Sequence, residues 1–150
     1  MDVPNYHFPR PVAEQSLVES LPKLLGCPII SSLIETPNSN HVIYWAMGRS
    51  DAIDNLMLFP QPLNTCSILD LEPPQFAMKL SKLLGVPVIT DLPQWHEYYK
   101  VPFYYFLAEP DGSTWVIRAY DGLDGKYEFD YENREPIENK RKVQTGHSPL

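Results

Sequence analysis

Hydrophobic and polar positions follow the same pattern twice along this chain, at an offset of 59 residues. The first copy is LPKLLGCPIISSL, from Leu21 to Leu33, and the second is LSKLLGVPVITDL, from Leu80 to Leu92. Self-similarity at a fixed offset is typical of a chain that repeats one structural unit. The pattern therefore predicts an internal duplication. The alternative to duplication is that two unrelated segments each contain a helix that ends at a glycine and is followed by a strand.

Each copy contains the apolar spacing of a helix that buries one face. In both copies the apolar residues are spaced i, i+4, i+7 and i+8, which forms a single stripe. The two stripes are Leu17, Leu21, Leu24 and Leu25, then Phe76, Leu80, Leu83 and Leu84. We expect helices over about residues 12–25 and 74–84, each closed by a glycine. Pro22 lies inside the first helix and is expected to kink it or to split off its last turn.

Short apolar runs after each helix predict strands. We expect them over residues 28–34, 42–47 and 54–59 in the first unit, and over 87–92, 103–108, 114–120 and 126–132 in the second. The runs 42–47 and 103–108 are apolar almost throughout, which is typical of strands covered on both faces. The last strand alternates strictly. Its inward residues are expected to be Tyr127, Phe129 and Tyr131, and its outward residues Glu128, Asp130 and Glu132.

These elements predict an α+β fold built from two tandem α-β-β-β(-β) units. Antiparallel sheets would pack with the two helices about a pseudo-twofold axis, because neither small unit could bury its apolar face well alone. We expect one globular domain over residues 12–133, with repeats over about 12–71 and 72–133. The proline-rich residues 1–11 are expected to be extended and to cover an edge of the core. Residues 134–150 lose the periodicity and are expected to form a polar, flexible tail.

Composition and charge narrow the possible functions. The formal net charge is −7, and acidic side chains concentrate in residues 121–138, so direct binding to nucleic-acid phosphates is not expected. No apolar run approaches the roughly 20 residues that a membrane span needs. The two cysteines, Cys27 and Cys66, lie at positions that the repeat does not equate, and we expect no disulfide. The expected location is cytoplasmic.

Motifs that bind cofactors or perform catalysis are absent from the sequence. The chain has no phosphate-binding or dinucleotide-binding glycine motif, no HExxH, no GxSxG and no CxxC. We therefore expect no cofactor. Asp121, Asp124, Glu128 and Asp130 could supply oxygen ligands to a divalent cation. Because strand alternation directs Glu128 and Asp130 outward, where charge also discourages edge pairing, we expect no metal site.

The strongest candidate binding segment is WHEYYK, residues 95–100. It lies in a loop between two predicted strands, two residues longer than its counterpart in the first unit. A loop on a rigid scaffold commonly carries binding groups, and Trp and Tyr are enriched among the residues that dominate binding energy. The expected binding residues are Trp95, His96, Tyr98, Tyr99, Glu128 and Asp130. The alternative is a short helix whose aromatic side chains pack onto the sheet.

An enzymatic alternative relies on titratable side chains. His41 opens a strand and could meet His96 across the pseudo-twofold axis as an acid–base pair near neutral pH. The Arg118 guanidinium could clamp an anion, as in a hydrolase or a phosphodiesterase. The residues of this alternative are His96, His41, Glu97 and Arg118. In the structural alternative, Arg118 pairs with Glu128 or Asp130 on the next strand.

A third possibility is a sensor of a small ligand, with a pocket on the pseudo-twofold axis. Its expected lining is Tyr44, Trp45, Tyr104 and Tyr105. The missing catalytic motifs, the aromatic loop and the acidic strand favour a small, soluble, non-catalytic binding protein instead, acting as an adaptor, inhibitor or regulator. The expected partner is another protein with a basic surface. A monomer and a homodimer are both compatible with the sequence.

Overall fold

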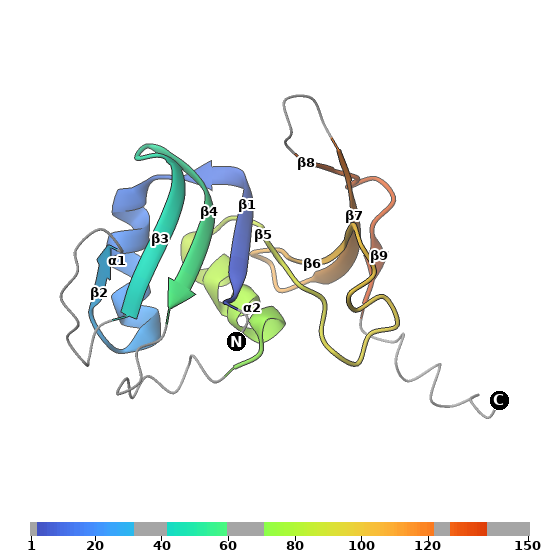
Figure 1. Cartoon of the computed structure of the whole chain (residues 1–150), viewed down its shortest axis with the longest axis horizontal. Coiled ribbons are helices and arrows are strands. Elements are labelled where there is room, and N and C mark those ends of the chain that lie inside the picture. The colour runs from blue at the N-terminus through green and yellow to red at the C-terminus, as the bar shows by residue number, and fades with distance from the viewer. Residues whose placement is uncertain (1–2, 32–41, 60–70, 122–126, 138–150) are drawn as a thin grey trace.

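Two helices and nine strands make up the described part of the chain, residues 3–31, 42–59, 71–121 and 127–137 of the computed structural model (Figure 1). In chain order they are β1 (Asn5–Val12), α1 (Glu14–Leu25), β2 (Ile29–Ser31), β3 (Val42–Arg49), β4 (Ala52–Phe59), α2 (Pro73–Leu84), β5 (Val88–Thr90), β6 (Tyr104–Ala108), β7 (Thr114–Asp121), β8 (Tyr127–Phe129) and β9 (Glu135–Pro136). This mixture of helices and mostly antiparallel strands confirms the predicted α+β class.

Both helices end at the predicted glycine. Gly26 and Gly85 adopt the left-handed conformation, with φ of 75° and 72°. Their backbone N–H groups donate to the carbonyl oxygens of Pro22 and Ser81, each at 2.8 Å. These bonds satisfy carbonyls that a helix end leaves open. Pro22 stays inside α1, so the last turn is not split off.

The strands form one continuous sheet in the order β2-β3-β4-β1-β5-β6-β7-β8, and β9 pairs with β7. β1 therefore lies between β4 and β5 and joins the two halves of the sheet (Figure 1). Tyr6 and Phe8 are buried on one side of β1, and alternation places His7 on the other side. The N-terminal segment is extended as predicted, but it is a central strand rather than a cover for the edge of the core.

Two prolines in β1 make it difficult to predict this strand from the sequence. Pro9 and Pro11 cannot donate a hydrogen bond to a neighbouring strand, which argues against a central strand. The register between β1 and β4 shifts between His7 and Val12, so both prolines fall where the ladder is interrupted. The strand tolerates them there, and the sequence pattern gives no sign of that interruption.

The two predicted units have the same order of elements but different strand pairing. The bounds of α1 and α2, and those of β2 and β5, differ by the predicted offset at both ends. β2 pairs with β3 in parallel, however, whereas β5 pairs with β6 in the antiparallel sense. Leu24 is half-buried against the core, while the corresponding Leu83 is 42% exposed. Internal duplication and the pseudo-twofold axis are therefore not confirmed.

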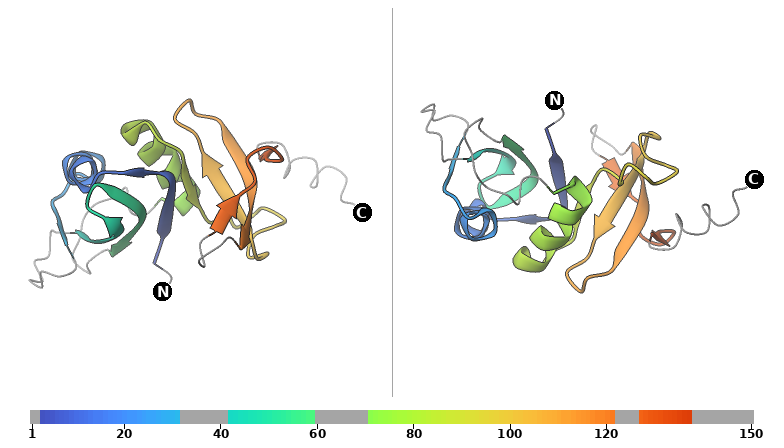
Figure 2. Two further views of the ribbon diagram at one scale, coloured as in Figure 1. Left: turned by 90° about the horizontal axis from the view of Figure 1, so that it is seen from above. Right: turned by 90° about the horizontal axis from the view of Figure 1, so that it is seen from below.

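Both helices pack on one face of the sheet, α1 beside the β2–β4 half and α2 beside β5 and β6 (Figure 2). The main core joins helix residues such as Leu17 and Phe76 to the inward side chains of the strands. A second cluster forms on the opposite face around Leu107. We call this opposite face, which no helix of the described residues covers, the open face. The second cluster on the open face consists of Ile89, Leu107, Ile117, Tyr105, Trp115, Phe129 and Tyr131.

The described residues cover β3 on one face only, although its apolar run predicts cover on both. Tyr44 is buried on the helix side, whereas Trp45 is 49% exposed on the open face. An apolar run alone does not distinguish a doubly covered strand from one that exposes apolar side chains to solvent or to a partner. Neither helix of the described residues is long and apolar enough to cross a membrane.

The residues predicted as a tail include a folded part. β9 pairs with Trp115 and Val116 of β7, and Ile137 is buried in the main core. Residues 134–137 thus belong to the packed structure. The rest of the predicted tail lies outside the described residues.

Cys27 is disulfide-bonded, which corrects the expectation that the cysteines stay unpaired. A disulfide requires that the Cα atoms of two cysteines lie close together in space, and the positions of the cysteines within a repeat do not determine that distance. The other cysteine of the chain, Cys66, lies outside the described residues. The disulfide also weakens the argument for a reducing cytoplasmic location.

Candidate functional site

The predicted binding segment lies in residues 91–103, which connect β5 to β6 and which we call the aromatic loop. Its backbone forms successive turns rather than the helix considered as an alternative. Backbone N–H groups of His96, Tyr99 and Val101 donate to the carbonyl oxygens three residues earlier, at 2.9–3.0 Å. Lys100 and Phe103 have φ of 68° and 72°, a conformation that non-glycine residues seldom adopt. Such strain persists only where the surrounding structure holds it.

Two of the predicted binding residues support the loop from inside. His96 is only 3% exposed, and its Nδ1 accepts the backbone N–H of Tyr98 at 3.0 Å. The Tyr98 ring lies 5.4 Å from the His96 ring and 4.6 Å from the ring of Tyr104 on β6, between centroids. His96 and Tyr98 therefore anchor the loop to the sheet.

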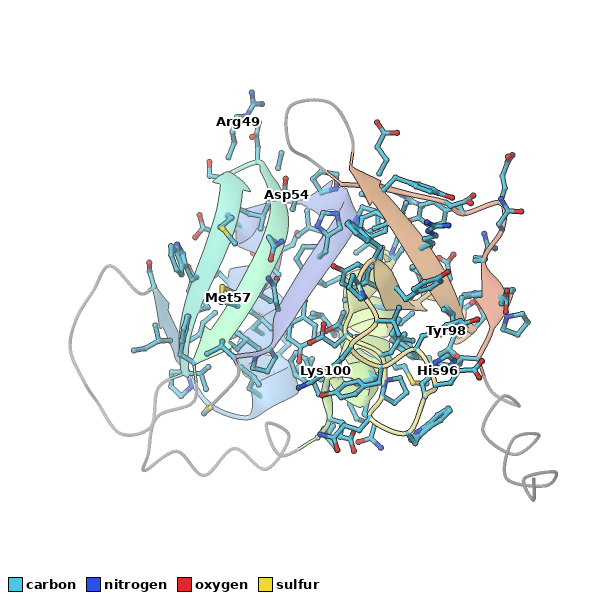
Figure 3. All side chains as sticks on the ribbon, turned by 45° about the vertical axis from the view of Figure 1, so that its right-hand side comes forward. Arg49, Asp54, Met57, His96, Tyr98 and Lys100 are labelled. Carbon is cyan, nitrogen blue, oxygen red and sulfur yellow. The ribbon has the colours of Figure 1, made fainter. Side chains whose placement is uncertain are left out.

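Large apolar side chains point outward from the same loop. Trp95, Val101 and Phe103 are 39%, 38% and 37% exposed. Figure 3 shows the loop residues His96, Tyr98 and Lys100 apart from Arg49 and Met57 of the β3–β4 hairpin. Val101 and Phe103 were not among the predicted binding residues, because residue type alone does not show which apolar side chains near a strand are exposed.

Arg118 joins the aromatic loop to the acidic strand through tyrosine rings. Its guanidinium carbon lies 5.9 Å from the ring centroid of Tyr104 and 5.1 Å from that of Tyr120. The Tyr120 hydroxyl donates to Asp130 at 3.0 Å. The structure places no ion pair between Arg118 and Asp130 or Glu128, all of which are described residues. Two cation–π contacts thus take the place of the expected structural pairing of Arg118, although Glu128 lies opposite Tyr120 on the same face of the sheet.

The acidic strand keeps the predicted alternation where its side chains are described. Glu128 and Glu132 are exposed, and Phe129 and Tyr131 pack against the cluster on the open face. Asp130 is half-buried and accepts hydrogen bonds from Asn133 and Tyr120. These bonds, with the Asn133 side chain first, hold the pKa of Asp130 below its usual range. Asp130 is therefore partly used in local structure.

The enzymatic arrangement is not assembled in the described residues. His96 is buried inside the loop, and the rings of Tyr98 and Tyr104 separate it from the exposed Arg118. Glu97 is exposed on the loop. His41 lies outside the described residues. Within the described ranges, no group of three His, Cys, Asp or Glu side chains is placed to hold a metal ion.

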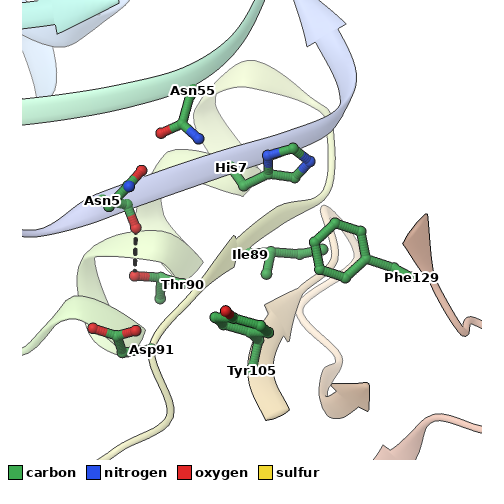
Figure 4. Close-up of a pocket in the computed structure, with 8 residues that line it drawn as sticks. All are labelled: Asn5, His7, Asn55, Ile89, Thr90, Asp91, Tyr105 and Phe129. Carbon is green, nitrogen blue, oxygen red and sulfur yellow. Dashed lines mark hydrogen bonds between the residues drawn. The ribbon is translucent and has the colours of Figure 1, made fainter. Parts of the chain in front are cut away.

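A cleft on the open face, at the junction of the two halves of the sheet, is the second candidate (Figure 4). Its volume is about 230 Å³. It is lined by Asn5, His7, Asn55, Ile89, Thr90, Asp91, Tyr105 and Phe129. Strand register brings three of them into one row, because Asn55 pairs with His7 and His7 pairs with Ile89. Sequence reasoning missed the cleft because its residues come from five separate segments.

Polar groups of the cleft are only partly satisfied. The Thr90 hydroxyl donates to the Asn5 carbonyl at 2.9 Å (Figure 4). The buried Oδ1 of Asn55 accepts no hydrogen bond from the described residues, an arrangement that costs about 1–3 kcal/mol unless a donor reaches it. Burial lowers the pKa of His7, and the nearby Asp54 carboxylate opposes this shift.

Only one of the four residues expected to line a ligand pocket lines this cleft. Tyr105 does so, while Tyr104 lines the neighbouring hollow beneath the loop. Tyr44 is buried under the helices, where its hydroxyl donates to Glu14 at 2.9 Å and its pKa is raised to about 12, first by burial. The hollow of Tyr104 shares Asp91 and Tyr105 with the cleft, so the two are contiguous.

Comparison with protein-family models, with curated proteins and with solved structures found no match for this chain.

Proposed function

We propose that this chain is a non-catalytic binding protein, an adaptor, inhibitor or regulator, that holds another protein through its aromatic loop and its acidic strand. One observation carries the proposal. The loop exposes Trp95, Val101 and Phe103 within nine residues, while turns and the Tyr98–Tyr104 contact hold its backbone in place. A contiguous exposed apolar patch marks an interaction site on a soluble protein, and we infer that these three side chains contribute to such a patch.

The backbone conformation of the loop supports the same reading. Lys100 and Phe103 both occupy the left-handed region, and a non-glycine residue there costs about 1–3 kcal/mol. Strain of this kind clusters at binding loops and switches. A preformed loop also loses little conformational entropy when a partner binds, which raises affinity.

Charge favours a basic partner surface. Glu97 is exposed on the loop, and Glu128 and Glu132 are exposed on and after β8. The row of rings from Tyr98 to Tyr120 connects these two acidic regions. Together with the net charge of −7, they would steer a positively charged partner toward the exposed apolar side chains. Binding is accordingly expected to weaken as salt concentration rises.

The matching bounds of the two helix–strand units support a further proposal on origin. α1 and α2 have the same length and end in the same glycine cap. We propose that they descend from one duplicated segment and that strand pairing later diverged, since β2 and β5 now pair in opposite senses.

Quantitative pull-down mass spectrometry tests the binding function. Tagged wild type is compared with Trp95→Ala/Phe103→Ala and with the control Trp45→Ala, which removes an even more exposed tryptophan from β3. We expect one basic protein to be retained by wild type and by Trp45→Ala, and to fall at least tenfold with the double variant. Circular dichroism establishes that all three proteins are folded. Equal recovery on all three baits would overturn the proposal.

A further inference from the structure

The cleft on the open face has the dimensions of a site for a small molecule. Its volume of about 230 Å³ is below the roughly 300–1,000 Å³ of sites that hold drug-sized ligands, so its occupant would be a fragment or a single side chain. The cleft lies where β1 joins β4 to β5. At this junction β1 pairs with β5 only through His7 and Ile89, so the two halves of the sheet diverge on either side of the cleft.

The chemistry of the walls favours a cation with N–H donors. Tyr105 and Phe129 present ring surfaces, and the Phe129 ring lies 5.1 Å from that of His7. Asp91 supplies a carboxylate at the exposed rim. Asn55 contributes an acceptor oxygen that no described residue satisfies. Aromatic rings combined with acceptor oxygens are the recognition elements for ammonium and guanidinium groups.

No basic side chain among the described residues lines the cleft. The charged and titratable groups that face it are His7, Asp91 and Tyr105, with Asp54 close to His7. Lys100 lines the contiguous hollow instead. Burial lowers the pKa of His7 and so favours its neutral imidazole, which does not repel a cation.

We propose that the cleft binds a small organic cation bearing N–H donors, a guanidinium or a primary ammonium group, with Asp91 as its counter-ion and Tyr105 and Phe129 as its ring contacts. The group could belong to a free small molecule or to an arginine or lysine side chain of a bound peptide. Both sources present the same chemistry to the cleft. The site is distinct from the outward face of the aromatic loop.

Titration of ¹⁵N-labelled protein followed by NMR tests the site. The probes are N-acetylarginine amide and its neutral isostere N-acetylcitrulline amide. We expect saturable shifts at residues 5–7, 55, 89–91, 105 and 129 with the arginine probe, and at least tenfold weaker binding of the citrulline probe, since a charge-assisted hydrogen bond is lost. Shifts that do not saturate, or equal binding of both probes, would refute the proposal.

Matched variants separate a binding effect from a structural one. Asp91→Asn should weaken binding of the arginine probe about tenfold, whereas Asp111→Asn, which removes an exposed carboxylate from the β6–β7 turn, should leave it unchanged. If both variants lose affinity alike, the cleft gives no specific recognition and the proposal fails. Lowering the pH toward the depressed pKa of His7 should also weaken binding, because protonated His7 repels the probe.

A second arm identifies the source of the cation. A capped Gly-Arg-Gly peptide is compared with methylguanidine in the same titration. Peptide affinity more than tenfold higher indicates a side chain of a bound protein, and equal affinity indicates a free small molecule. Loss of saturable binding for both rejects the cation site. Trp95→Ala should change none of these affinities, so the cleft can be confirmed or rejected independently of the loop.

Discussion

Tyr98 of the aromatic loop stacks on Tyr104 of β6, with 4.6 Å between ring centroids and an angle of 30° between the rings. Tyr104 in turn lies under the guanidinium of Arg118. A tyrosine that sequence analysis assigns to binding therefore fixes the loop to the sheet. The side chains that remain for a partner are the outward ones, Trp95, Val101 and Phe103.

Removing the Tyr98 ring is expected to loosen the loop. Tyr98→Ala loses ring packing worth about 1–3 kcal/mol, since the side chain is only half-buried. Tyr98→Phe keeps the ring and should be nearly neutral. Urea unfolding measures the global effect, and hydrogen exchange of the amides of residues 96–101 measures the local one. Unchanged amide protection in Tyr98→Ala would contradict the anchoring role.

Arg118 is expected to contribute little to stability. Its guanidinium is exposed and makes cation–π contacts with Tyr104 and Tyr120, which at exposed sites are worth about 0.5–1 kcal/mol. Arg118→Met should therefore lower the free energy of unfolding by about 1 kcal/mol or less. A loss of about 3–5 kcal/mol in urea unfolding would indicate a buried ion pair instead.

His7 makes stability depend on pH. Its pKa in the folded state is lowered by burial, so the unfolded chain binds a proton more readily just below the ordinary pKa of histidine. The contribution of neutral His7 is present above that pKa and is lost as pH falls toward the folded value. Wild type should lose more stability than His7→Phe between pH 7.5 and 5.5 in urea unfolding. Parallel losses in the two proteins would show that other groups cause the dependence.

Gly48 is expected to be the glycine least tolerant of substitution among those described. Its φ is 117°, and a Cβ atom there would lie 2.5 Å from the backbone oxygen of Ala52. At Gly85 the φ is also positive, but a Cβ atom meets nothing within 4 Å. Gly85→Ala should cost about 1–2 kcal/mol from backbone strain, and Gly48→Ala about 1–3 kcal/mol beyond that, because the clash is added. Thermal unfolding that ranks the two variants in the opposite order would be inconsistent with this hairpin geometry.

The helices and most strands could be predicted because local patterns determine them. Apolar spacing and a closing glycine locate α1 and α2. Strict alternation predicts a strand over residues 126–132, of which β8 forms Tyr127–Phe129. Local patterns do not determine which strands pair with each other. They therefore predict neither the position of β1 between β4 and β5 nor the parallel pairing of β2 with β3. Pro9 and Pro11 make β1 harder to predict, because prolines argue against a central strand and the sequence does not show that the hydrogen-bond ladder of β1 is interrupted there.

The candidate site was predictable in position but not in orientation. Trp95, His96 and Tyr98 are all residue types that either bind partners or fill cores, and only the three-dimensional packing assigns His96 and Tyr98 to the interior. The cleft depends on distant residues such as His7, Asn55 and Phe129 meeting across the sheet. The spacing of these residues along the chain does not indicate that they lie close together in space.

Site-specific photo-crosslinking tests the binding surface most directly. A benzoylphenylalanine replaces Val101 on the loop in one protein and Trp45 on β3 in another; both positions are exposed. We expect the probe at position 101 to crosslink to the basic protein retained in pull-down, and the probe at position 45 not to do so. Crosslinking of that protein from position 45 and not from position 101 would contradict this expectation.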